Sequence, residues 1–226
     1  MDKKVILERV QKLHAFFKNG KIPTLAHHEV HPDLDPASRE NYLYFTLPPC
    51  LNFQRNSPAM WASALMTWED PETNYLIFPE KVMEKKREEV QKDLLKHKLG
   101  LQKNKHTDIW IAISTAFHIF YHDDPRELLE NSQWDVLAIH ETIQKTKKKN
   151  FPYLSGPKMA HYWLYILSQY TDAQFVNMHE ISIIPDTHVL QSTVQLGMTE
   201  SIQTSLVVVQ LWKDLLDGST ISPVEM

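Results

Sequence analysis

Two side chains in the second half of the chain are of types that could carry out covalent chemistry. Lys158 follows Gly156 and Pro157, and Asp186 opens the segment Asp-Thr-His-Val. Pro157 suits the first turn of a helix, where its missing N–H costs nothing, so we expect a helix to start beside Lys158. The positive end of that helix, with partial burial, would lower the pKa of the amine from about 10.4. An unprotonated Lys158 would be a nucleophile.

The elements that position Lys158 are predicted to be a helix, a tight turn and a second helix within residues 134–170. The first helix ends in KTKKKN, the connection is FPYLSGP, and Gly156 is expected to adopt a backbone conformation closed to other residues. Exposed amides at such a turn and helix start form a phosphate-binding site. We therefore predict that Leu154, Ser155 and Gly156, together with Lys149, bind the DNA backbone.

Lysines are concentrated at this hairpin, although the chain carries a formal net charge of −4. A net negative charge argues mildly against a nucleic-acid partner. Five lysines nevertheless lie within fourteen residues, at positions 145, 147, 148, 149 and 158. A local basic face and a solvated helix end are both consistent with this pattern.

Asp186 is suitably placed to cap the helix that it opens, and capping alone would explain an aspartate there. Considered together with the hairpin, however, the segment has a second interpretation. PYLSGPKMA and the following Asp-Thr-His-Val segment resemble the paired motifs of the helix-hairpin-helix DNA glycosylases. The spacing between them resembles the archaeal 8-oxoguanine glycosylases more than the endonuclease III branch. Leu154 replaces the first glycine of the family's hairpin.

The resemblance covers roughly residues 134–197 and implies a base-excision-repair glycosylase that acts on damaged double-stranded DNA. The damaged nucleotide, an oxidised purine such as 8-oxoguanine, would be extruded into a pocket. Lys158 would attack C1′ and form an imine that permits strand cleavage, which makes the enzyme a lyase as well. Asp186 would stabilise positive charge on the sugar. With a single cysteine no iron–sulfur cluster is expected, and neither metal nor cofactor is implied.

Other DNA contacts follow less directly from the sequence. Asn52, Gln54 and Arg55 are candidates to fill the gap left in the duplex. Trp212 and Trp61 are candidates to stack on the extruded base, although an aromatic ring in a helical core is the commoner arrangement. Lys158 itself could be a surface lysine that only binds phosphate.

An all-α, two-lobed fold is predicted from helical periodicity and from a glycine count of only five. Helices are expected at about residues 3–18, 57–69, 80–98, 106–121, 134–149, 157–170, 186–196 and 199–216. Residues 41–47 and 74–78 are expected to be short strands or extended connectors. We expect one unit of 1–226, with an N-terminal helical part to about residue 130, irregular at 22–56, and a catalytic part over about 131–226.

The composition indicates a globular protein of an intracellular compartment, in the cytoplasm, nucleoid or nucleus. No signal peptide or membrane span is expected, and by the family resemblance we expect a monomer. Two alternatives remain. One is a DNA-binding protein that keeps the hairpin without catalysis. The other is an HD-type metal phosphohydrolase that uses histidines such as His27, His28, His31, His118 and His122.

Overall fold

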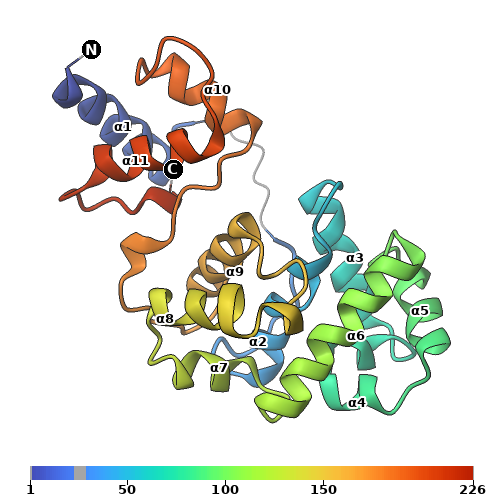
Figure 1. Ribbon diagram of the computed structural model, residues 1–226. Coiled ribbons are helices and arrows are strands. Elements are labelled where there is room, and N and C mark those ends of the chain that lie inside the picture. Colours follow the sequence, from blue (N-terminus) through green and yellow to red (C-terminus); the bar gives the residue numbers. More distant parts are fainter. Residues whose placement is uncertain (1, 23–28, 226) are drawn as a thin grey trace. The chain divides into compact units, whose positions relative to one another are not determined.

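The computed structural model describes residues 2–22 and 29–225 and confirms the all-α class (Figure 1). Its α-helices are α1 Lys3–Lys18, α2 Arg39–Thr46, α3 Ser57–Glu69, α4 Pro79–Met83, α5 Arg87–Lys96, α6 Lys103–Phe120, α7 Pro125–Asn131, α8 Val136–His140, α9 Pro157–Tyr170, α10 Thr187–Gln195 and α11 Ser205–Leu216. Shorter helical turns are η1 Pro48–Leu51, η2 Asn74–Ile77, η3 Glu141–Thr146, η4 Lys148–Asn150, η5 Met178–Glu180 and η6 Pro223–Glu225.

The chain divides into two compact units. The first, the terminal unit, combines Met1–Ala26 with Asn177–Met226, and the second, the central unit, is His27–Val176. From the sequence we expected a boundary near residue 130. The division instead falls after Ala26 and after Val176. The terminal unit combines both ends of the chain because α1 packs against α11, although nearly the whole chain separates these helices in sequence.

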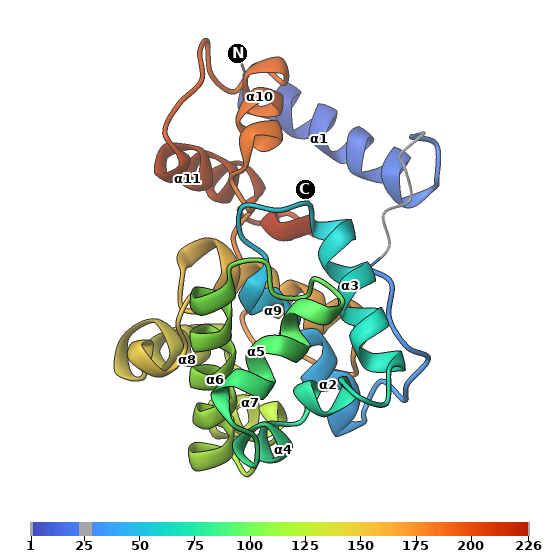
Figure 2. The same ribbon diagram turned by 90° about the vertical axis from the view of Figure 1, so that its right-hand side faces the viewer.

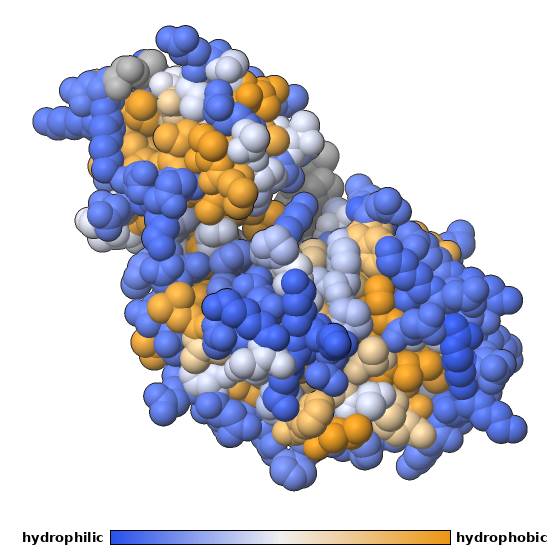
Figure 3. Space-filling view, viewed as in Figure 1, coloured by the Kyte–Doolittle hydropathy of each residue, from blue (hydrophilic) through white to orange (hydrophobic). Residues whose placement is uncertain are grey.

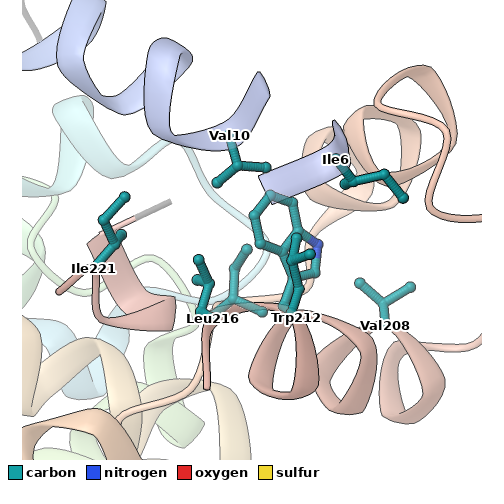
Figure 4. Close-up of a cluster of buried hydrophobic side chains, with 8 residues drawn as sticks. Ile6, Val10, Val208, Trp212, Leu216 and Ile221 are labelled. Atoms are coloured by element: carbon teal, nitrogen blue, oxygen red, sulfur yellow. The ribbon is translucent and has the colours of Figure 1, made fainter. Parts of the chain in front are cut away.

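The core of the terminal unit is formed by both ends of the chain. Ile6 and Val10 of α1 face Trp212 of α11, as Figure 4 shows. Trp212 is 2% exposed, and its indole N–H donates to the Thr193 hydroxyl at 2.9 Å. Hydrophobic side chains also remain on the visible face of this unit (Figure 3), and Leu206 is 84% exposed.

The central unit is organised around α2, which the sequence predicted to be extended. Ser38 caps this helix by accepting from the amide of Asn41 at 3.2 Å. Every residue from 41 to 50 is buried, so the helix has no polar face to produce a 3.6-residue period. The expected strand or connector at 41–47 is therefore wrong. The stretch 22–56, expected to be irregular, contains α2 and η1, whereas residues 29–38 and 52–56 have no regular structure.

Three other predicted elements are corrected by the structure. Residues 74–78 contain the 3₁₀ turn η2. The single helix expected over 80–98 is two helices, and Glu89 accepts a hydrogen bond from the Lys86 amide where the second one starts. The predicted helix 134–149 begins at Val136, becomes the π-helix η3, and ends in the 3₁₀ turn η4. Figure 2 shows the resulting central unit, with α5 beside α6.

Candidate nucleic-acid interface

The turn between η4 and α9 is anchored by two buried apolar side chains. Phe151 and Leu154 are both 0% exposed. The amides of Leu154, Ser155 and Gly156 donate to the carbonyls of Pro152, Phe151 and Tyr153 at 2.8–2.9 Å. The turn amides are thus already satisfied inside the protein. Leu154, Ser155 and Gly156 have no backbone donor left for phosphate, which contradicts the predicted role of this turn.

Gly156 is required for a different reason from the one predicted. Its φ is −67°, a value open to all residues, and the left-handed residue of the turn is Tyr153, with a φ of +66°. A Cβ at position 156 would lie 3.1 Å from the Tyr153 carbonyl oxygen. The glycine therefore permits a close approach of the backbone to itself.

The start of α9 provides the free amides that the turn lacks. Pro157 occupies the first turn as predicted, and no side chain caps the helix. The first backbone bond is donated by Ala160 to Gly156, at 2.9 Å. Within the described part of the chain, the amides of Lys158 and Met159 have no acceptor. Lys158 is exposed whereas Met159 is 4% exposed, so the Lys158 amide and the positive end of this 14-residue helix are available to an anion.

Lys158 is exposed beside these amides, so the partial burial expected from the sequence is wrong. Lys148 and Lys149 are exposed as well, and none of the three forms an ion pair with a described residue. Lys145 differs because it pairs with Glu141 at 2.6 Å. Three uncompensated cations therefore precede and open α9, as a phosphate-binding surface requires.

A second loop, residues 52–55, contacts the hairpin within the central unit. The Tyr153 hydroxyl donates to the Asn52 carbonyl at 3.1 Å, and the Tyr153 and Phe53 rings lie 4.3 Å apart. The structure thus brings the predicted gap-filling residues together with the hairpin. No local pattern reveals this contact, because it joins positions about 100 residues apart in the sequence.

The three residues predicted to fill the gap in the duplex differ from one another in their surroundings. The side chain of Asn52 donates to the Ser57 hydroxyl at 3.1 Å. Arg55 donates to the Leu99 carbonyl at 2.7 Å, and burial lowers the pKa of its guanidinium. Gln54 is exposed and has a φ of +53°. Gln54 is therefore the exposed residue of this loop, with its side-chain oxygen accepting from Gln102 at 3.2 Å, whereas Asn52 and Arg55 hold the loop in place.

Neither predicted stacking tryptophan offers a ring face to a base. Trp61 is 1% exposed, and its indole N–H donates to the Tyr162 hydroxyl at 3.0 Å. Trp212 lies in the core of the terminal unit, as described above. Both rings are core side chains in this structure, so their assignment to a base pocket is corrected.

A polar cluster around Trp61 was missed by the sequence analysis. Tyr162 and Tyr170 of α9 donate to the two carboxylate oxygens of Glu29, at 3.4 and 2.5 Å. Burial raises the pKa of Tyr162 to about 12, so its hydroxyl stays protonated. The sequence could not place Glu29 here, because more than 130 residues separate it from either tyrosine.

Asp186 lies in the terminal unit and caps α10, as predicted. Its Oδ1 accepts a hydrogen bond from the Val189 amide at 3.0 Å. Oδ2 accepts none from the described residues. The carboxylate is therefore fixed by one oxygen and keeps the other for an outside group.

The histidines do not gather into a metal site in the described part of the chain. His118 pairs with Asp123 at 2.8 Å and His122 with Glu127 at 2.7 Å, as two separate surface pairs. Among the residues at 2–22 and 29–225, no three His, Cys, Asp or Glu side chains are grouped to hold an ion. His27 and His28 lie outside the described residues.

Comparison of the chain with family models, with curated proteins and with solved structures finds no match. In the part of the chain that the structure describes, no helix is long and apolar enough to cross a membrane.

Proposed function

We propose that this protein is a DNA glycosylase of the helix-hairpin-helix type with lyase activity on damaged double-stranded DNA. The observation that carries the proposal is the exposed, unpaired Lys158 at the open start of α9, next to two amides without acceptors. The Lys158 amide, with Lys148 and Lys149, would bind the DNA backbone. Lys158 would then be held beside a sugar.

In the proposed reaction, the lone pair of Lys158 Nζ forms a bond to C1′ as the C1′–N bond to the base breaks. The electron pair of that bond leaves with the base, which takes up a proton. Opening of the sugar ring gives an imine between Lys158 and C1′. Loss of a proton from C2′ then expels the 3′ phosphate by β-elimination.

Asp186 is proposed to stabilise the positive charge that develops on the sugar. Its fixed orientation supports this role, because the cap bond to Val189 engages only Oδ1. An oxidised purine such as 8-oxoguanine is the proposed lesion, on the basis of the family resemblance.

Gln54 is proposed to enter the gap that the extruded nucleotide leaves in the duplex. It is the exposed residue of the loop that contacts the hairpin, and its side chain is bound only at the surface, by Gln102, whereas the side chains of Asn52 and Arg55 are part-buried. The metal-hydrolase alternative finds no support in the described residues, because the two histidine–carboxylate pairs remain separate.

Borohydride trapping tests the proposal. The protein is incubated, with chelator present, on duplexes that carry 8-oxoguanine, uracil, thymine glycol or an abasic site. We expect a covalent adduct with at least one of these duplexes, and we expect Lys158→Gln to abolish it. Lys81→Gln, a control that removes one exposed lysine charge from another part of the central unit, should still form it. No adduct on any duplex, with retained DNA binding, would favour a non-catalytic DNA-binding protein instead.

A further inference from the structure

The loop at residues 52–55 connects the hairpin to a second segment of the central unit, the connection between α5 and α6. Arg55 donates to the carbonyls of Leu99 and Lys98, at 2.7 and 3.2 Å. Gln102 donates to the Gln54 side chain at 3.2 Å. The loop is therefore bound on one side to the hairpin and on the other side to residues 98–102.

This connection and the first turn of α6 carry three lysines, Lys98, Lys103 and Lys105, which we call the second lysine patch. All three are exposed, and none forms an ion pair with a described residue. Lys96 nearby contrasts with them, because it binds Asp70 at 2.7 Å. No Asp or Glu occurs in the sequence between positions 93 and 108. The patch thus keeps its positive charge although the chain is acidic overall.

Aromatic contacts join the second lysine patch to the hairpin. The Lys105 ammonium lies 4.4 Å from the centre of the Phe53 ring, and that ring packs against Tyr153. Such a cation–π contact holds the lysine at a defined place on the surface. In Figure 3, hydrophilic side chains also cover much of the face over α5, the helix that precedes this connection.

We propose that the second lysine patch binds phosphates of the same DNA duplex, beyond those held by the hairpin. The proposal rests on the proposed function for the identity of the partner. A duplex fits because its phosphates form a continuous row of negative charge, and the two cationic segments are joined through residues 52–55. The patch would extend the footprint on undamaged flanking DNA and take no part in the chemistry.

The test measures how binding to an undamaged duplex depends on salt. The slope of log K against log salt is negative, and each lost phosphate contact reduces its magnitude by about 0.9. We expect Lys103→Gln/Lys105→Gln to reduce this magnitude by about 1.8, which is two such contacts. Lys103→Arg/Lys105→Arg should keep the wild-type slope. This variant distinguishes an effect of the lost charge from an effect of misfolding.

The matched control is Lys81→Gln/Lys85→Gln. Both control lysines are exposed and lie over aromatic rings, Lys81 at 4.3 Å from Phe78 and Lys85 at 5.1 Å from Tyr75. The control removes the same charge from another part of the central unit, together with two ring contacts where the patch variant removes that of Lys105. Its salt slope should stay within error of the wild-type value.

Equal slopes for the two glutamine variants would overturn the proposal. An unchanged DNA slope with loss of binding to phosphatidylserine vesicles would also overturn it, in favour of a membrane surface. Borohydride trapping on saturating lesion duplex is run in parallel, and the patch variants should form as much adduct as the wild type. A slope change without any adduct in the wild type would support the patch and refute the glycosylase proposal, so the two claims fail separately.

Discussion

The starts of α9 and α10 are built in opposite ways. In the central unit, α9 begins without a side-chain cap, and the amides of Lys158 and Met159 have no acceptor in the described structure. In the terminal unit, α10 begins with Asp186, whose carboxylate accepts from Val189. The open start attracts an anion, whereas the closed start holds an anion of its own. One unit is thus suited to bind phosphate and the other to present a fixed carboxylate.

The largest expected effect comes from removing the charge at the closed start. Asp186→Asn keeps an oxygen to cap α10 but loses the carboxylate, so excision should slow by about 10²–10⁴-fold while duplex binding is retained. Single-turnover excision and unfolding are measured on the same variant. Asp2→Asn is the control, because Asp2 caps α1 in the same unit. Equal, small effects of the two variants would reduce Asp186 to a cap.

Acid should weaken the central unit through His106. This histidine is 1% exposed, and burial, with Arg55 and Lys105 nearby, lowers its pKa from 6.5 to about 4. The unfolded chain binds the proton more readily than the folded one. The stability that neutral His106 contributes is therefore fully present above about pH 6.5 and is lost as the pH drops toward 4. Between pH 7 and 5 the loss attributable to His106 should be on the order of 1–2 kcal/mol.

Urea unfolding of His106→Asn measures this contribution. Asparagine keeps an oxygen to accept the Leu101 amide, which now donates to the histidine Nδ1 at 3.0 Å. The difference in unfolding free energy between pH 7 and 5 should shrink in the variant. An identical pH dependence in both proteins would show that His106 carries the proton equally in the folded and unfolded states.

Closing the open start should weaken DNA binding. Gly156→Asp places a carboxylate where it can cap α9 and repel phosphate, so duplex affinity should fall about tenfold, equivalent to about 1.4 kcal/mol. Gly156→Ala is the control for the new Cβ, which meets the Tyr153 carbonyl at 3.1 Å. Equal losses of affinity in the two variants would assign the effect to the turn geometry and not to the helix start.

The smallest effect is expected at Trp212. Trp212→Phe removes the hydrogen bond to Thr193 from the core of the terminal unit, at a cost of about 0.5–1.5 kcal/mol in unfolding free energy. Excision on saturating duplex should not change, because the ring has no exposed face. A large fall in excision with unchanged stability would return Trp212 to the base pocket.

Local signals in the sequence were enough to predict several elements. The helices at 3–18, 57–69 and 157–170 coincide with α1, α3 and α9, and the cap by Asp186 is correct. These features depend on side chains within a few positions of one another. Helical periodicity and capping chemistry can therefore be read directly from the sequence.

Features that depend on distant packing could not be predicted. The helix α2 is buried on all sides, so its aromatic run NYLYFT resembled a strand. Trp61 and Trp212 were candidates for a base pocket as well as for the core, and only the packing of the chain shows that both are buried. The contacts of Tyr153 with Asn52 and Phe53 join positions about 100 residues apart, and they place the loop beside the hairpin.

The most direct test of the account is to map the residue that becomes attached to DNA. After borohydride trapping on the lesion duplex that reacts, the adduct is digested and the modified peptide is identified by mass spectrometry. The account predicts a sugar remnant on Lys158, at the open start of α9. A remnant on another amine, such as Lys148 or Lys149, would contradict it and show that Lys158 only binds phosphate.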